Sequence, residues 1–315
     1  MILPDAVVLC EVGPRDGLQN EARAVPTQVK VELINRLSQA GFRSIEVTSF
    51  VHPRWIPQLA DADEVMRRIE RRPGVVYSAL VPNERGLERA LRAGAGGVNV
   101  FLSASETHNR KNINKSISET YPVLEPVVRT AKAEGLPVRG YVSTAFGCPY
   151  EGRVPVEQVV QVARRLVEMG VDEVSIGDTI GVAVPMEVTA LVEALAAVVP
   201  LERIALHFHD TRGTAVANIA AGLRAGVRRF DASIGGLGGC PYAPGATGNV
   251  ATEDVLYLLH RSGVDTGIDE ERVGETADWL ERALGRPLSS HASAIRRGRC
   301  GDGAAGAENE GGEGR

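Results

Sequence analysis

The chain has 315 residues, a formal net charge of -5, 43% hydrophobic residues and 24% charged residues. This composition is ordinary for a soluble globular protein with an ample core. The negative charge argues against a nucleic-acid partner, because phosphates attract a basic surface. No apolar run approaches the roughly 18 residues that a membrane helix needs, so no membrane partner is expected.

The N-terminal residues and the cysteines both indicate a cytoplasmic protein. An apolar, strand-like run at 6–12 follows Met1 so closely that we expect no signal or transit peptide. The four cysteines, Cys10, Cys148, Cys240 and Cys300, form no CxxC pair, so neither a zinc knuckle nor a redox dithiol is indicated. We therefore expect free thiols in a reducing cytoplasm.

Short β-branched runs alternate with longer amphipathic segments. Strands are predicted at 7–12, 44–48, 75–81, 98–102, 138–143, 173–176, 204–208 and 230–234. The helical segments between them include 27–40, 60–71, 156–169, 186–198 and 214–225. Five glycines follow helical segments, where a C-cap takes positive φ: Gly41, Gly94, Gly135, Gly170 and Gly226. Eight βα units predict a closed barrel or a doubly wound sheet. No GxGxxG follows the first strand, which favours an α/β fold of the (β/α)8 TIM-barrel class, with its site at the C-terminal rim.

The chain continues beyond the eighth strand. A further amphipathic helix is predicted at 270–284, and we assign residues 1–290 to one catalytic barrel domain. Residues 298–315 contain seven glycines among 18 residues and almost nothing apolar. Such a segment cannot offset its ordering entropy, so a disordered Gly/Glu-rich tail is predicted.

Two polar motifs follow predicted strands. His207 and His209 end the seventh strand, and residues two apart on a strand point to the same side. The alternative is that one imidazole caps a loop while the other packs in the core. After the first strand, Asp16 is a candidate oxygen ligand and Arg15 a candidate guanidinium for a carboxylate or an enolate. The alternative for this pair is a solvated ion pair in a turn; Gln19, in the same run, is a candidate substrate contact.

A third motif is the loop from Gly235 to Asn249, which holds six glycines and two prolines in 15 residues. Long irregular loops in compact domains are usually functional. Cys240 lies near its middle and, with an ordinary pKa of about 8.5, would be protonated and able to donate a proton at pH 7. A bystander cysteine is the alternative. Asn249 is either a helix N-cap or a metal ligand.

Asp16, His207, His209 and Asn249 together offer two oxygens and two nitrogens, a set that suits octahedral Mg²⁺ or Mn²⁺. For Glu46, Tyr141 and Asp178, a structural hydrogen bond is as well supported as a catalytic role. The remaining histidines, His52, His108, His260 and His291, are interpreted as surface or packing residues. For the basic cluster Arg110, Lys111 and Lys115, a solvated loop is favoured over phosphate contact.

The motifs GPRDGLQNE, IEVTSF, GDTIG, HFHDTRG and GGLGGCPYAPGATGN, in this order, resemble those of the hydroxymethylglutaryl-CoA lyases, which belong to the metal-dependent TIM-barrel lyases and Claisen-type synthases. The resemblance covers roughly residues 5–290 and implies cleavage of 3-hydroxy-3-methylglutaryl-CoA to acetoacetate and acetyl-CoA, as in leucine breakdown. It implies Asp16, His207, His209 and Asn249 as metal ligands. It also implies Arg15 as a substrate contact, Cys240 as the catalytic thiol, and Glu46, Tyr141 and Asp178 as supporting groups. An acyl-CoA substrate and a homodimer are further expectations from the family.

The chain departs from the family pattern at Ala22, where a Lys is common, and at Arg212, where a Tyr is common. Neither position carries a proposed ligand, but a longer branched 3-hydroxyglutaryl-CoA stays open as the substrate. A Claisen-condensing enzyme of the same superfamily is the main alternative. A carboxyltransferase would need a carboxylated lysine at a strand end, which we do not find, and a non-catalytic binding barrel would be indifferent to chelators.

Overall fold

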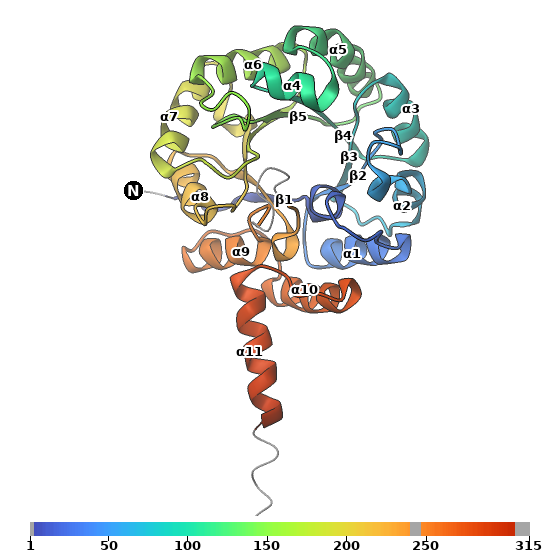
Figure 1. Ribbon diagram of the computed structural model, residues 1–315, viewed down its shortest axis with the longest axis vertical. Coiled ribbons are helices and arrows are strands. Elements are labelled where there is room, and N and C mark those ends of the chain that lie inside the picture. Colours follow the sequence, from blue (N-terminus) through green and yellow to red (C-terminus); the bar gives the residue numbers. More distant parts are fainter. Residues whose placement is uncertain (1–2, 240–246, 306–315) are drawn as a thin grey trace, which may run out of the picture.

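The computed structural model describes residues 3–239 and 247–305. Eight parallel strands form a closed barrel in sequence order, and the last strand pairs with the first (Figure 1). The strands are β1 (Val8–Glu11), β2 (Ser44–Ser49), β3 (Val76–Leu80), β4 (Gly97–Ser103), β5 (Val138–Ser143), β6 (Glu173–Asp178), β7 (Ile204–Phe208) and β8 (Arg229–Ala232). The predicted TIM barrel is therefore confirmed.

Helices surround the strands (Figure 1), so each strand is covered outside by helices and inside by the filled barrel. These helices are α1 (Thr27–Gln39), α2 (Ala62–Arg68), α3 (Glu84–Ala93), α4 (Glu106–Ile113), α5 (Ile117–Ala133), α6 (Val156–Glu168), α7 (Pro185–Ala196), α8 (Ala215–Arg224) and α9 (Thr252–Arg261). All five glycines predicted as C-caps have positive φ. No helix in the described part of the chain is long and apolar enough to cross a membrane.

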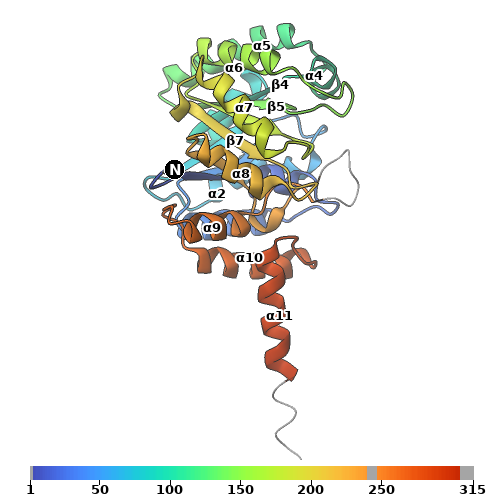
Figure 2. The ribbon, with the colours of Figure 1, turned by 90° about the vertical axis from the view of Figure 1, so that its left-hand side faces the viewer.

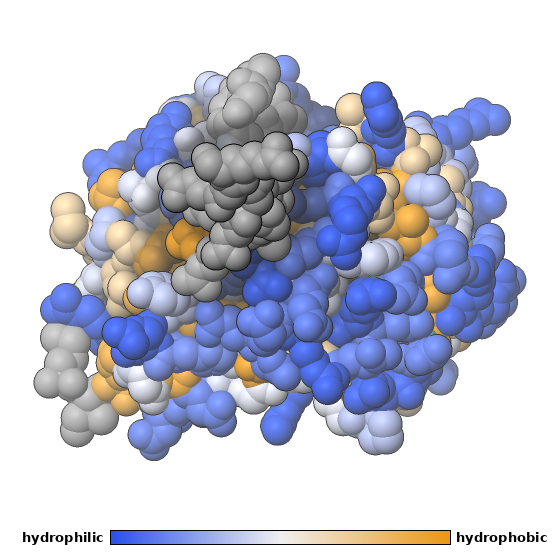
Figure 3. All heavy atoms as spheres, turned by 90° about the horizontal axis from the view of Figure 1, so that it is seen from below, coloured by the Kyte–Doolittle hydropathy of each residue, from blue (hydrophilic) through white to orange (hydrophobic). Residues whose placement is uncertain are grey.

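Two helices follow the barrel. Helix α10 (Glu270–Leu284) has the predicted bounds, and α11 (His291–Ala305) projects away from the barrel (Figures 1 and 2). Helix α11 was not predicted, and it makes residues 298–305 of the predicted tail helical; residues 306–315 lie outside the described residues. Seen from the α11 end, the visible described surface is mostly hydrophilic, with scattered apolar residues (Figure 3).

Candidate active site

The first segment of the site is a wide helical turn, Gly13–Gly17, that follows β1 directly. Gly13 donates its backbone N–H to Glu11 Oε1 at 2.8 Å, and a Cβ on Gly13 would lie 2.6 Å from that oxygen. A side chain at this position would therefore push the turn away from β1. The close approach places Arg15 and Asp16 over the C-terminal end of the barrel, where active sites of this fold lie.

Asp16, His207 and His209 lie together at this end, with one ligand atom of each within 4.8 Å of the others. The rings of His207 and His209 have their centroids 5.3 Å apart, so the prediction that both imidazoles face the same side is confirmed. His209 Nε2 lies 3.9 Å from Asp16 Oδ2. A turn after β1 and the end of β7 thus meet in one cluster.

Asn249, the fourth predicted ligand, lies beside this cluster. Its Nδ2 donates to Asp16 Oδ2 at 2.9 Å and to the Leu237 carbonyl at 3.1 Å. Its backbone pairs with that of His209 in an isolated bridge. The Asn249 amide therefore faces Asp16 through its nitrogen. A rotation of half a turn about the Cβ–Cγ bond would place Oδ1 where Nδ2 lies.

The protonation states of the cluster fit a divalent cation. Burial raises the pKa of Asp16, but the Arg15 charge and the two histidines outweigh it and hold that pKa well below its usual range. Burial and the neighbouring His207 lower the pKa of His209 to about 4, which keeps it a neutral imidazole. His209 Nδ1 is buried and has no hydrogen-bond partner among the described residues. A carboxylate and an unsatisfied neutral imidazole are the forms that ligate metals.

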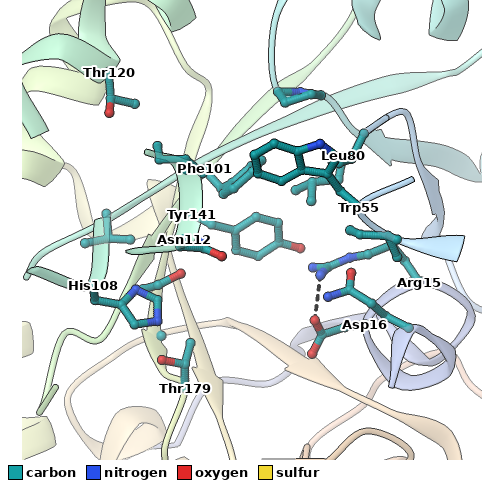
Figure 4. A pocket seen from close by; sticks show the side chains of 18 of the residues that line it. Arg15, Asp16, Trp55, Leu80, Phe101, His108, Asn112, Thr120, Tyr141 and Thr179 are labelled. Carbon is teal, nitrogen blue, oxygen red and sulfur yellow. Dashed lines mark hydrogen bonds and ion pairs between the residues drawn. The ribbon is translucent and has the colours of Figure 1, made fainter. Parts of the chain in front are cut away.

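Arg15 joins two carboxylates at the cavity. Its Nη1 lies 2.5 Å from Asp16 Oδ1 (Figure 4). Its Nη2 lies 2.7 Å from Glu46 Oε2, and the Arg15 side chain is 9% exposed. Although burial opposes the charge, these carboxylates raise the pKa of Arg15. Its guanidinium carbon lies 5.7 Å from the centre of the Tyr141 ring. The guanidinium is therefore a fixed cation facing the cavity.

Glu46 on β2 is held by partners from the turn after β1 and from two other strands, β4 and β5. Besides Arg15, it accepts hydrogen bonds from Asn99 Nδ2 at 2.9 Å and from the Tyr141 hydroxyl at 3.2 Å. Burial and the Glu46 charge raise the pKa of Tyr141 well above its ordinary value, so the phenol stays a donor. Glu46 lies within β2 and Tyr141 within β5, and both lie next to Arg15; their role in the reaction stays a prediction.

A cavity of about 650 Å³ opens from the cluster, a size typical of small-molecule sites. Its walls include the predicted residues Arg15, Asp16, Gln19, Tyr141, His207 and His209. Gln19 Oε1 is buried without a hydrogen-bond partner in the described part of the chain. Asp178 is not a wall residue: its two oxygens accept from the backbone N–H groups of Val182 and Ala183 at 3.0 and 2.8 Å. Its role in substrate binding stays a prediction, and Cys240 lies outside the described residues.

Other wall residues were not predicted from the sequence. Trp55 follows β2, His108 and Asn112 lie on α4, and Thr179 follows β6 (Figure 4). Lys115, which follows α4, also lines the cavity. His108, interpreted as a surface or packing residue, is 7% exposed and its Nδ1 lies 2.6 Å from Ser103 Oγ. Of the basic cluster, Lys115 lines the cavity, whereas Arg110 pairs with Glu106 at 3.0 Å. These wall residues share one signal, which is a place in the segments that connect β2 to α2, β4 to α5 and β6 to α7. In this fold such segments at the C-terminal ends of the strands form the active site.

The carboxylate behind His207 was also missed. Asp231 on β8 is fully buried, and its Oδ2 lies 3.1 Å from His207 Nδ1. Burial lowers the pKa of His207, but the Asp231 hydrogen bond and charge outweigh this and raise it. Burial disfavours the charged form of Asp231 and so raises its pKa, but the Arg139 charge outweighs burial and lowers that pKa.

The HMGL-like family model matches residues 6–280 of the chain. The chain belongs to this family. It is 53% identical to the hydroxymethylglutaryl-CoA lyase of Bacillus subtilis, over 92% of this chain and 97% of that protein. It is 52% identical to a 3-hydroxy-3-methylglutaryl-CoA lyase of Danio rerio named cytoplasmic, over 94% and 88% of the two chains. The crystal structure of the Pseudomonas aeruginosa hydroxymethylglutaryl-CoA lyase superposes with a TM-score of 0.93 at 49% identity, covering 95% of this chain and all of that one.

Proposed function

We propose that this protein is a carbon–carbon lyase that splits 3-hydroxy-3-methylglutaryl-CoA into acetoacetate and acetyl-CoA. The observation that carries the proposal is the cluster of Asp16, His207 and His209 beside Arg15, in the wall of the cavity. Identity of about half over nine-tenths of the chain to two lyases of this substrate supports the same reaction. The acyl-CoA is thus the proposed partner.

The proposed cofactor is Mg²⁺ or Mn²⁺, held by Asp16, His207, His209 and the Asn249 amide oxygen. When bound, such a cation lowers the pKa of a coordinated hydroxyl and neutralises charge on it. Mixed oxygen and imidazole ligands suit these ions better than the thiolate sets of structural zinc. The ligand atoms of Asp16, His207 and His209, which all lie within 4.8 Å of one another, support this donor set.

The reaction is a retro-Claisen cleavage. His207 or Asp16 accepts the proton of the substrate's C3 hydroxyl; the C3 oxygen becomes the ketone of acetoacetate, and the bond from C3 to C2 breaks. The bond's electron pair leaves on acetyl-CoA as an enolate, whose oxygen Arg15 stabilises, an effect of about 3–4 kcal/mol in a dry site. Cys240 then protonates the enolate carbon. Glu46 and Tyr141 keep the Arg15 guanidinium in place.

The test is acetoacetate release from 3-hydroxy-3-methylglutaryl-CoA by protein treated with EDTA and then resupplied with metal. We expect no product after chelation and recovery with Mg²⁺ or Mn²⁺. Cleavage that EDTA does not affect would contradict the proposed metal. Cleavage only of a longer 3-hydroxyglutaryl-CoA would contradict the proposed substrate. Incubation with acetyl-CoA and 2-oxo acids, with free CoA as the readout, tests the condensing alternative.

Cytoplasmic location and a homodimer are also proposed. Relatives named cytoplasmic support the location, although a relative at 49% identity from Rattus norvegicus is named mitochondrial. Fractionation of cells and light scattering of the purified protein test these two points.

A further inference from the structure

The carboxylate of Asp231 lies directly behind one imidazole of the cluster. Strands β7 and β8 pair in parallel with His207 opposite Asp231, so both side chains enter the barrel at the same level. Asp231 Oδ2 lies 3.1 Å from His207 Nδ1, and the Asp231 side chain has no exposed surface. Because Nδ1 is engaged, Nε2 is the His207 nitrogen left to face Asp16.

Asp231 is itself held from two more strands. Ser175 Oγ on β6 donates to Oδ2 at 3.1 Å, and Arg139 Nη2 on β5 donates to Oδ1 at 2.6 Å. Arg139 is held in turn by Glu173, whose Oε1 lies 2.7 Å from Nε. Both carboxylate oxygens therefore have partners with fixed directions, and the group cannot rotate away from His207 without breaking a buried ion pair.

The second imidazole lacks such support. His209 Nδ1 is buried without a hydrogen-bond partner among the described residues, although His209 is as deeply buried as His207. A carboxylate on the far nitrogen of a ligating imidazole fixes its tautomer and its ring orientation, and makes it a better ligand. Of the two imidazoles, only His207 has this arrangement within the described part of the chain.

We propose that Asp231 is a positioning residue, which holds His207 as the Nδ1–H tautomer with Nε2 directed at the cation, and that Arg139 keeps Asp231 in place. This inference rests on the proposed metal site. Because both His207 nitrogens are then engaged, it leaves Asp16 as the base of the proposed cleavage. It also assigns a task to two charged groups in the barrel that take no direct part in that cleavage.

The variant Asp231→Asn tests the proposal. An amide in this position can turn its NH₂ toward His207 Nδ1, which would leave the proton on Nε2 and block ligation. We expect the Kd for Mn²⁺, measured from the EPR signal of free Mn²⁺, to rise about 10- to 100-fold. Turnover should recover in part at high Mn²⁺, which a merely structural defect would not show. The control Ser175→Ala removes one hydrogen bond to the same oxygen but keeps the charge, and should change the Kd much less.

A second measurement uses wild-type protein and so does not depend on the variant folding. In ¹⁵N-histidine-labelled protein, Mg²⁺ should shift the Nε2 resonance of His207, assigned by its loss in His207→Gln, and not the Nδ1 resonance. A shift at Nδ1, or Asp231→Asn protein with wild-type Mn²⁺ affinity, would overturn the positioning role while Mn²⁺-dependent cleavage by the wild type stands. Wild-type protein that binds no Mn²⁺ would remove the metal site and this proposal together.

Discussion

Arg15, Gln19 and His209 share one property: each has a buried polar atom without a hydrogen-bond partner in the described part of the chain. These atoms are a guanidinium N–H, an amide oxygen and an imidazole nitrogen, and all three residues line the same cavity. Unsatisfied buried groups are costly and uncommon in native proteins. Three such atoms at one cavity are expected where a ligand supplies the missing partners.

The thiol of Cys240 provides the first prediction at this scale. Cys240→Ser should lower turnover strongly, because a serine hydroxyl is a far weaker acid than a thiol and protonates an enolate poorly. Mn²⁺ affinity should stay nearly unchanged, since Cys240 is not a proposed ligand. Steady-state acetoacetate release and Mn²⁺ titration measure the two effects, and equal turnover in the variant would remove the thiol from the mechanism.

At the residue scale, sequence identified the groups that local geometry controls. The two-residue spacing of His207 and His209 predicted their common direction, and the turn after the first strand predicted the place of Asp16. Asp231 could not be found in this way. Its partnership with His207 depends on the register of β7 against β8 and on the ion pair with Arg139, 92 residues away along the chain.

At the scale of elements, the sequence patterns predicted all eight strands, and the predicted bounds of β5 and β7 are the observed ones. Helices α4 and α11 were missed for identifiable reasons. Helix α4 is short and polar and begins at a Ser105 cap that accepts from the His108 N–H. Helix α11 contains three glycines, which disfavour helix, and its side chains pair with α10 through Arg296 and Asp278 at 2.9 Å. Tertiary contacts stabilised what local propensity did not predict.

The start of the glycine loop is packed against the segment that follows α10. Gly235 has φ +62°, and a Cβ there would lie 2.3 Å from Leu288 Cδ1. Gly235→Ala should therefore lower the free energy of unfolding by about 1–2 kcal/mol for the left-handed backbone and a further 1–3 kcal/mol for overpacking. The control is Gly263→Ala, because Gly263 has φ +75° and no atom within 4 Å of an added Cβ. This variant should lose only the part of the free energy of unfolding that comes from the left-handed backbone. Urea unfolding of both variants measures the difference, and equal losses would contradict the packing argument.

Helix α9 carries a buried acid that supports the same loop. Both oxygens of Glu253 accept from the Gly235 N–H, at 3.0 and 2.8 Å. Burial, together with the nearby Glu11 and Asp254, raises the pKa of Glu253 to about 8. Of its neighbours, Glu11 on β1 is also buried with a raised pKa, and Asp254 pairs with His291 at 3.0 Å.

This raised pKa makes stability depend on pH. The folded protein keeps the Glu253 proton that the unfolded chain loses near pH 4.5. The contribution of Glu253 to the free energy of unfolding is therefore complete below that pH and is lost as the pH rises to about 8. The slope is at most about 1.4 kcal/mol per pH unit. In Glu253→Gln the group no longer titrates, so the variant should gain Tm relative to wild type between pH 5 and pH 8 and level off above. A pH-independent Tm difference would show that Glu253 is ionised throughout.

At the scale of the molecule, the barrel depends on the segment after α10 more than on the end of α11. Leu288 is 2% exposed, and the Ser289 N–H donates to the Gly235 carbonyl at 3.0 Å. Truncation after Pro287 should cost about 2–5 kcal/mol of stability, as for loss of a large core side chain, and should lower turnover. Truncation after Arg297 should leave both close to wild type, because Ser293, Arg296 and Arg297 remain. Thermal melts and acetoacetate assays separate the two, and equal melting temperatures would refute the distinction.

Strand β1 pairs with β8, and this closure joins the first residues of the site to the last. Asp16 follows the first strand, whereas Asn249 follows the eighth, so the four proposed ligands assemble only when the ring is shut. During translation the emerging chain would carry Asp16 out of the ribosome long before its companions. The cation therefore binds only late in synthesis and folding. Incomplete chains should bind no metal at this site and should be inactive even at high metal concentration.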